Sequence, residues 1–178
     1  MIYPYISGVD YESVADGPGV RAAIFLSGCT HNCPGCHNPQ THDPCHGVEM
    51  NELVVNTIAY NIHIRKFLSG ITLTGGDPLY DTDKTYAFLV SLRNKLGKRW
   101  DTTSVWLYTG YTWEKLMKLY PAFDNLRNLL SMVDVVVDGP FIQTRADKTL
   151  AFRGSFNQRL IDVQKSLKQG VPVLWNAD

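Results

Sequence analysis

Short apolar runs recur along the chain and predict the strands of a sheet. Continuous hydrophobic stretches lie at residues 20–27, 71–74, 104–108 and 133–137, and each leads into a segment rich in glycine or proline. Runs of this length, bounded by turn residues, are typical of buried strands. Two further candidate strands lie at residues 159–163 and 171–175.

The segments between these runs carry hydrophobic residues at helical spacing. Residues 50–69 predict a helix whose inward face holds Leu53, Val54, Thr57, Ile58 and Ile62, with Gly70 as its stop. The next predicted helix ends at Gly97 and buries Phe88, Leu89, Leu92 and Leu96. Two shorter helices are predicted at residues 112–120, where Pro121 ends the helix, and 126–132.

Strands that alternate with helices predict a mainly parallel sheet with right-handed crossovers. A closed eight-unit barrel needs about 250 residues, whereas this chain has 178. We therefore expect an α/β fold, a single-domain open partial (β/α) barrel covering residues 1–178. Parallel strands carry their ligands at the carboxyl ends, which places the segments 28–47, 75–78, 108–111 and 138–141 on one rim.

Charge and composition narrow the function. Lys plus Arg and Asp plus Glu number 17 each, so the net charge is zero and no nucleic-acid partner is expected. The basic residues of 143–170 favour a solvated surface over a docking patch. The first residues do not resemble a secretion signal, and no apolar run approaches the roughly 18 residues that cross a bilayer. We expect a cytoplasmic protein without membrane contact, in which clustered cysteines indicate metal or catalysis.

The stretch from Cys29 to Cys36 carries the main chemical motif. Cys29, Cys33 and Cys36 follow a predicted strand with the spacing C-x3-C-x2-C, which differs from the paired spacings of zinc fingers. Soft thiolates at this spacing suit an iron–sulfur cluster, and three ligands for four irons leave one iron open to a substrate. Two alternatives stay open: Cys45 as a fourth ligand, and a mixed zinc site that uses the loop histidines His31, His37, His42 and His46.

With these motifs the chain resembles the radical S-adenosylmethionine enzymes, and within them the small activating proteins of anaerobic (class III) ribonucleotide reductase. The resemblance extends in order from residue 16 to about 159. Its motifs are Asp16-Gly-Pro-Gly19, Ser27-Gly-Cys29, Cys33-Pro-Gly-Cys36-His-Asn38, Thr74-Gly-Gly-Asp-Pro-Leu79, Trp106-Leu-Tyr-Thr-Gly-Tyr111, Val137-Asp-Gly-Pro-Phe141, Arg153-Gly-Ser and Asn157-Gln-Arg159.

The resemblance implies an enzyme with two cofactors, a 4Fe–4S cluster and S-adenosylmethionine. The cluster would be bound by Cys29, Cys33 and Cys36, and one electron would split S-adenosylmethionine into methionine and a 5′-deoxyadenosyl radical. That radical would remove a hydrogen from a glycine of the reductase's catalytic subunit. An external one-electron reductant, such as a flavodoxin or thioredoxin system, is implied as a second partner.

The resemblance also assigns cofactor contacts. Gly75, Gly76, Asp77 and Pro78 correspond to a Gly-Gly-Glu-Pro segment that holds the methionine amino group, although Asp77 is one methylene shorter than Glu. The backbone of Gly35, Cys36 and His37 would contact adenine, since Gly35 stands where an aromatic residue is common. Tyr108 and Asp138 are further candidates, with core packing and turn capping as the alternatives. Asp16-Gly-Pro-Gly19 would lie near the protein substrate, and the Arg153–Arg159 segment has no physical account.

Two other classes of function remain open from sequence. One is an electron-transfer protein whose cluster is closed by four thiolates. The other is an interaction domain stabilised by zinc. Within the favoured class, the substrate could also be another glycyl-radical enzyme or a small molecule.

Overall fold

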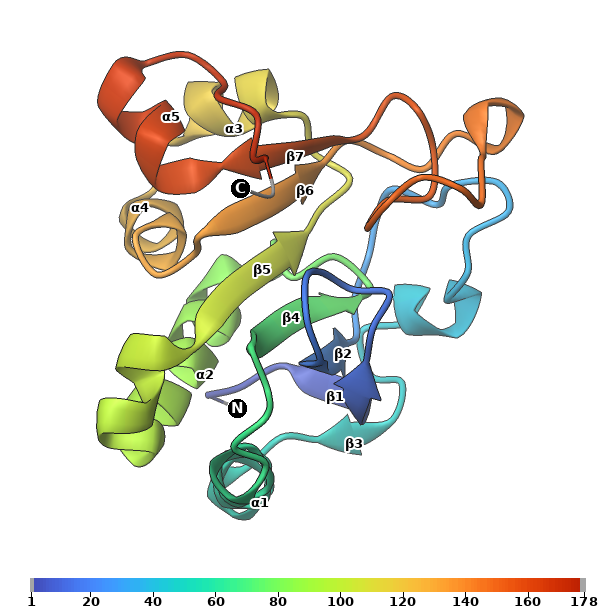
Figure 1. The fold of residues 1–178 in the computed structure, drawn as a ribbon. Helices are drawn as coiled ribbons and strands as arrows, with labels where there is room; N and C mark the ends of the chain where they lie inside the picture. Colours follow the sequence, from blue (N-terminus) through green and yellow to red (C-terminus); the bar gives the residue numbers. More distant parts are fainter. Residues whose placement is uncertain (1, 177–178) are drawn as a thin grey trace.

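The computed structural model describes residues 2–176, which fold around one seven-stranded mixed sheet (Figure 1). The strand order is β3-β1-β2-β4-β5-β6-β7. Strands β2, β4, β5 and β6 are parallel, and β1, β3 and β7 extend this centre with antiparallel pairings. The strands are β1 (Tyr5–Ser13), β2 (Arg21–Leu26), β3 (Val48–Glu49), β4 (Gly70–Gly75), β5 (Ser104–Tyr108), β6 (Val135–Asp138) and β7 (Arg159–Asp162).

Helices connect the four parallel strands in sequence, and a last helix follows β7. The long loops after β2 and β6 lie together at one end of the sheet (Figure 1). Helix α2 packs against both α1 and α4. The α-helices are α1 (Glu52–Ile64), α2 (Thr82–Leu96), α3 (Trp113–Leu119), α4 (Asp124–Leu130) and α5 (Val163–Gln169). Short 3-10 helices occupy Pro39–His42, Gly97–Thr102 and Gln143–Arg145.

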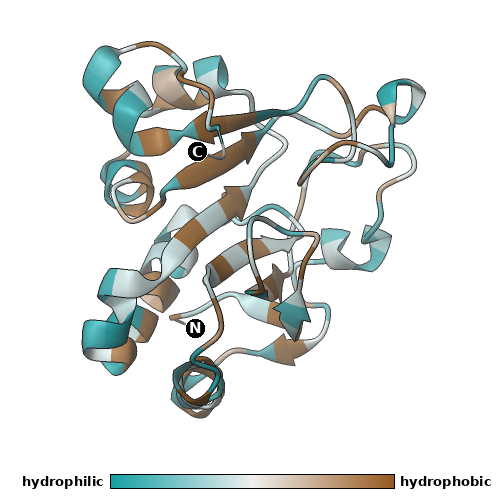
Figure 2. Cartoon of the chain, in the orientation of Figure 1, coloured by the Kyte–Doolittle hydropathy of each residue, from teal (hydrophilic) through white to brown (hydrophobic). Residues whose placement is uncertain are grey.

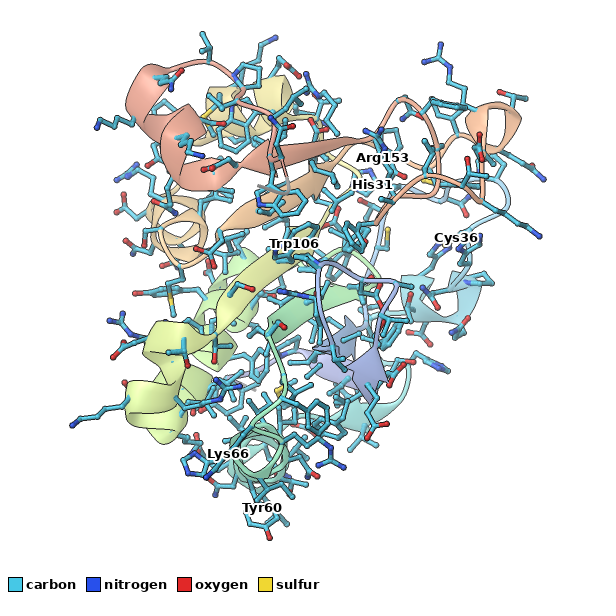
Figure 3. All side chains as sticks on the ribbon, in the orientation of Figure 1. His31, Cys36, Tyr60, Lys66, Trp106 and Arg153 are labelled. Carbon is cyan, nitrogen blue, oxygen red and sulfur yellow. The ribbon has the colours of Figure 1, made fainter. Side chains whose placement is uncertain are left out.

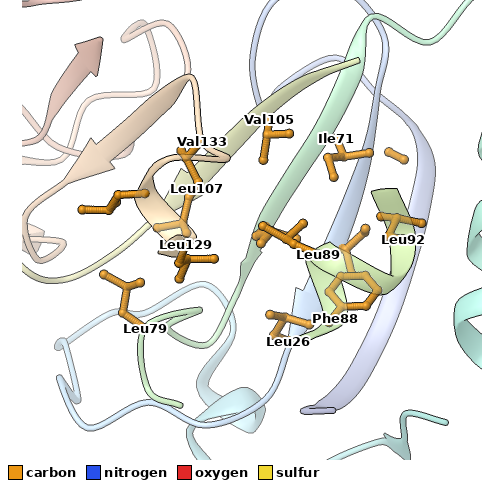
Figure 4. Close-up of a cluster of buried hydrophobic side chains, with 14 of the residues drawn as sticks. Leu26, Ile71, Leu79, Phe88, Leu89, Leu92, Val105, Leu107, Leu129 and Val133 are labelled. Carbon is orange, nitrogen blue, oxygen red and sulfur yellow. The ribbon is translucent and has the colours of Figure 1, made fainter. Parts of the chain in front are cut away.

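The main core lies between the sheet and the helices. Alternate strand residues such as Ile24, Leu73 and Leu107 are fully buried on this face. They belong to one buried cluster with Phe88 and Leu89 of α2, and Figure 4 shows Leu107 in this cluster. The central strands are therefore mostly hydrophobic, whereas the helices are hydrophilic on their outer sides (Figure 2).

The opposite face of the sheet buries a charged residue. Arg21 is fully buried, and its Nε donates to Thr72 Oγ1 at 2.8 Å and its Nη1 to Ser104 Oγ at 2.8 Å. Burial lowers the pKa of Arg21 to about 10. Its guanidinium lies 5.3 Å from the ring of Trp106, on which Phe152 and Trp175 pack edge to face. This face is thus filled by a polar and aromatic layer.

Most predicted elements are confirmed, and the α/β class with a mainly parallel centre is correct. The four apolar runs are β2, β4, β5 and β6, and residues 159–162 form β7, which runs antiparallel. The predicted strand at 171–175 is wrong, because this segment makes only one isolated bridge, between Leu174 and Ile161. β1 was not predicted; its pairing with β2 contains two irregularities, so its burial does not alternate.

The first helix is present, but its predicted face was shifted by one position. The buried residues are Val55, Ile58, Ala59 and Ile62, while Leu53 is 73% exposed. Ile58 and Ile62 belong to both possible stripes, so the pattern alone did not fix the phase. The helix ends at Ile64, and Gly70 instead begins β4, where a Cβ would collide with the backbone of Ser104.

Candidate iron–sulfur and cofactor site

The segment 28–47, here called the cysteine loop, begins directly after β2. Gly28 has φ +105°, a conformation that favours glycine, and its N–H donates to Thr41 O at 2.8 Å. Cys29 N donates to His42 O at 3.3 Å, so the loop folds back on itself. Cys29, Cys33 and Cys36 are partly buried and unpaired, whereas Cys45 is exposed.

The three cysteines of the motif line one cavity of about 360 Å³ at the carboxyl end of the parallel strands. Phe25, Thr74 and Tyr108 lie at the carboxyl ends of the adjacent strands β2, β4 and β5 and line this cavity. Figure 3 shows Cys36, His31 and Arg153 near this end of the molecule. The other lining residues are Ala15, Asp16, Cys29, Cys33, His37, Asn38, His42, Gly75, Gly76, Thr109, Phe141, Leu150, Phe152, Gly154 and Gln158.

Backbone N–H groups point at two of the three sulfurs. Asn38 N donates to Cys36 Sγ at 3.4 Å. Burial raises the pKa of the Cys29 thiol, and hydrogen bonds from the N–H groups of His31 and Asn32 oppose that rise. Asn32 adopts φ +46°, unusual for a residue other than glycine. Unpaired thiols with N–H donors around one cavity fit an iron–sulfur cluster, whose sulfurs accept such hydrogen bonds.

The residues of the Gly-Gly-Asp-Pro segment, Gly75 to Pro78, differ in whether they line the cavity. Gly75 and Gly76 line the cavity, whereas Asp77 is 4% exposed and lies outside the lining together with Pro78. Asp77 Oδ1 accepts from Leu79 N at 2.8 Å. Its Oδ2 lies 2.6 Å from His31 Nε2. The same oxygen accepts from Thr109 Oγ1 at 2.9 Å and from Gly110 N at 3.1 Å. Asp77 thus ties the cysteine loop to the ends of β4 and β5.

Asp138, a predicted cofactor contact, is 1% exposed and engaged within the protein. Its Oδ2 accepts from Trp113 N at 2.7 Å, at the start of α3. Arg159 binds both carboxylate oxygens, with Nε at 3.1 Å from Oδ1 and Nη2 at 2.5 Å from Oδ2. The guanidinium also forms a bidentate pair with Glu114 at 2.9 Å. Asp138 therefore joins the start of α3 to the start of β7 and lies outside the cavity lining.

The other predicted contacts are distributed around the cavity. Cys36, His37 and Tyr108 line it, and the ring of His37 lies 5.5 Å from that of Phe141. Gly35 has φ +74° and lies just outside, where a Cβ would meet the side chain of Gln143 at 3.0 Å. Burial raises the pKa of Tyr108, whose hydroxyl donates to Phe152 O at 2.7 Å.

The structure explains the Arg153–Arg159 segment, for which the sequence offered no physical explanation. Arg153 lines the cavity and Arg159 is paired with two acids, so neither belongs to the solvated basic surface predicted for residues 143–170. The remaining basic residues of that stretch are exposed as predicted: Arg145, Lys148, Lys165 and Lys168. Arg153 and Phe141 were not predicted as site residues, although both lie in the loop that follows the last parallel strand.

The segment before β2 also reaches the site. Asp16 lines the cavity, its carboxylate accepts from Ser13 Oγ at 2.5 Å, and its carbonyl accepts from Thr72 Oγ1 at 2.7 Å. Gly17 has φ +136° and packs against Arg21 and Trp106. Within residues 2–176, no three His, Cys, Asp or Glu side chains converge on a single-ion site. The same residues include no helix long and apolar enough to cross a membrane.

Comparison with known proteins agrees with this geometry. Residues 15–161 match the model of the 4Fe-4S single cluster domain. The chain is 35% identical over 147 residues to the anaerobic ribonucleoside-triphosphate reductase-activating protein of Pasteurella multocida, covering 82% of this chain and 89% of that one. The protein of the same name from Enterobacteria phage T4 is 34% identical over 160 residues, with coverages of 90% and 93%.

A third relative of the same name, from Escherichia coli K12, is 32% identical over 146 residues, with coverages of 82% and 90%. The matched region contains the three cysteines and the other residues that line the cavity from Ala15 to Gln158. The chain therefore belongs to the family of anaerobic ribonucleoside-triphosphate reductase-activating proteins, which carry a 4Fe-4S single cluster domain.

Proposed function

We propose that this protein is a radical S-adenosylmethionine enzyme that reductively cleaves S-adenosylmethionine at a 4Fe–4S cluster. Its product would be a glycyl radical on the catalytic subunit of anaerobic ribonucleoside-triphosphate reductase. One observation carries the proposal: three unpaired cysteine thiols share the wall of a single cavity, while the fourth cysteine, Cys45, is exposed outside it. Three protein ligands for four irons leave one iron for a substrate.

The residues around the cavity suit that chemistry. Cys29, Cys33 and Cys36 would hold the cluster, which when bound supplies the electron for cleavage of the sulfonium. Gly75 and Gly76 bring backbone groups to the cavity wall next to the cysteines, where they would bind the amino group of the cofactor. The cavity volume of about 360 Å³ falls in the range of roughly 300–1,000 Å³ for small-molecule sites.

The fold would also protect the reaction. The cavity lies between the cysteine loop, the segment around Asp16 and the loop around Phe152, which together would exclude water and oxygen. A glycine on a flexible segment of the reductase would have to enter between these loops. The electron would come from an external one-electron reductant, such as a flavodoxin or thioredoxin system.

The test is anaerobic reconstitution with iron and sulfide, followed by electron paramagnetic resonance with and without S-adenosylmethionine. We expect a reduced-cluster spectrum that changes when the cofactor is added. Mixing with the reductase subunit should then give a glycyl radical signal. Loss of iron and of cofactor cleavage is expected for Cys33→Ala, whereas Cys45→Ala should retain both.

Opposite outcomes would identify other functions. A cluster whose spectrum is indifferent to S-adenosylmethionine, and which is lost in Cys45→Ala, would indicate a closed electron-transfer centre. A colourless anaerobic protein that contains zinc and no sulfide would indicate a zinc-stabilised domain. Cofactor cleavage without a glycyl radical on this reductase would point to a different substrate.

A further inference from the structure

The guanidinium of Arg153 has an unused hydrogen-bond donor inside the molecule. Its Nη1 donates to Gln158 O at 3.0 Å, whereas its Nε is buried and has no partner among residues 2–176. The side chain lines the same cavity as the three cysteines. A buried donor without a partner is costly, and more so in a charged group, so each one needs an explanation, and a bound ligand is one.

The loop that carries Arg153 is held in place by its own hydrogen bonds. Gln158 Oε1 accepts from Gly154 N at 2.9 Å and from Ser155 N at 3.1 Å, and Gln158 Nε2 donates to Gly139 O at 3.1 Å. On the other side, the Tyr108 hydroxyl holds Phe152 O at 2.7 Å. Arg153 therefore projects from a segment fixed to the ends of both β5 and β6, which preorganises it for binding.

The charges in the cavity wall favour an anionic partner for this arginine. Among the lining residues described, Arg153 is the one Lys or Arg, and Asp16 is the one carboxylate. The Asp16 carboxylate already accepts from Ser13. A planar guanidinium matches the two oxygens of a carboxylate, and a charge-assisted pair of this kind is among the stronger hydrogen bonds in proteins.

We propose that Arg153 binds the carboxylate of the methionine moiety of S-adenosylmethionine. The inference rests on the proposed function, because it takes that cofactor as the ligand of the cavity. Arg153 is then a positioning residue, which orients the amino-acid end of the cofactor toward the cysteines. It does not take part in electron transfer.

The test compares two ligands on the anaerobically reconstituted, oxidised protein, in which no turnover occurs. Dissociation constants are measured by calorimetry for S-adenosylmethionine and for its decarboxylated analogue, S-adenosyl-3-methylthiopropylamine. The variants are Arg153→Met, Arg153→Lys and, as a matched control, Arg145→Met, since Arg145 lies exposed on the same loop and outside the cavity lining. Iron content and circular dichroism verify that each variant is folded and loaded.

We expect Arg153→Met to weaken binding of S-adenosylmethionine by about 10- to 100-fold. Binding of the decarboxylated analogue should change less than about threefold, because the lost group has no partner on that ligand. Arg153→Lys should recover part of the affinity, and Arg145→Met should match the wild type.

Two other results would overturn the inference in distinguishable ways. In Arg153→Met, equal weakening of both ligands would show that Arg153 only supports the loop, and unchanged binding of both would show that Arg153 does not contact the cofactor. The proposed function would stand in either case. A wild-type protein that holds its cluster but binds neither ligand would remove the proposed function and this inference together.

Discussion

The Asp77 carboxylate offers the sharpest test of how the fold positions the cysteine loop. Four groups contact it: the N–H of Leu79, the hydroxyl of Thr109, the N–H of Gly110 and the ring of His31. These groups come from three separate segments. The substitution Asp77→Asn keeps the size of the side chain but replaces one acceptor oxygen with an NH2 group, so that at least one buried donor faces another donor.

The loss of stability in Asp77→Asn can be worked out from this pairing of two donors. An unsatisfied buried donor costs about 1–3 kcal/mol, and the remaining bonds lose their charge assistance. Because Asp77 is 4% exposed, water cannot replace the lost partner. We therefore expect Asp77→Asn to lower the free energy of unfolding by about 2–3 kcal/mol. With a urea m value of about 2 kcal/mol per M, the unfolding midpoint would fall by about 1–1.5 M.

The assay is urea unfolding of the cluster-free protein, followed by circular dichroism, so that iron binding does not contribute to stability. Thr109→Val is the matched control, since it removes one of the four contacts and should cost about 1 kcal/mol. In reconstituted protein, Asp77→Asn should also lower iron retention, because His31 lies between Cys29 and Cys33 and loses its anchor.

A single result would refute this reasoning. If Asp77→Asn left the urea midpoint unchanged yet weakened binding of S-adenosylmethionine, the carboxylate would face the cofactor and its internal hydrogen bonds would be dispensable. That outcome would restore the role suggested by the resemblance to the Gly-Gly-Glu-Pro segment.

Three further changes probe the same end of the sheet. Arg159→Met leaves the buried carboxylate of Asp138 without its ion pair and should cost about 3 kcal/mol in the same urea assay; a loss below about 1 kcal/mol would contradict the pairing. Tyr108→Phe removes the hydrogen bond to Phe152 O and should cost about 1 kcal/mol, with faster hydrogen exchange in residues 150–158 as its sign. Gly76→Ala places a Cβ 2.5 Å from a carbonyl oxygen of the cysteine loop, so iron incorporation should fall sharply; normal incorporation would show that the loop can move aside.

The sequence predicted the parallel centre of the fold well because its strands are buried on both faces. Such strands are continuous apolar runs, as at residues 104–108, and they need no partner to be recognised. The edge strands are different. β1 contains Gly8, pairs irregularly and is largely half-exposed, so no hydrophobic pattern marks it. The segment 171–175 has a strand-like composition, yet Trp175 packs on Trp106 and Leu174 makes a single bridge.

That Cys29, Cys33 and Cys36 line one cavity was predictable because metal chemistry restricts both residue type and spacing, so local sequence is enough to group them. The internal partners of Asp77 and Asp138 could not be predicted, and the reason is physical; their cofactor contacts stay predictions. A carboxylate at the end of a parallel strand has two kinds of partner in reach: a ligand in the crevice, or the free N–H groups where the next segment begins. Sequence gives the position of the carboxylate along the strand but not the direction in which its oxygens point.

That choice depends on residues far away in the chain. Asp138 is turned inward by Arg159, 21 positions later, and Asp77 by the Thr109–Gly110 turn and by His31, 46 positions earlier. Arg153 differs, because its own loop satisfies only Nη1 of the guanidinium, and Nε has no partner among residues 2–176. At this rim, then, Asp77 and Asp138 hold the loops together, whereas Arg153 keeps a donor without a partner in the described part of the chain, and this difference is why we propose an anionic ligand group for Arg153 and not for the two carboxylates.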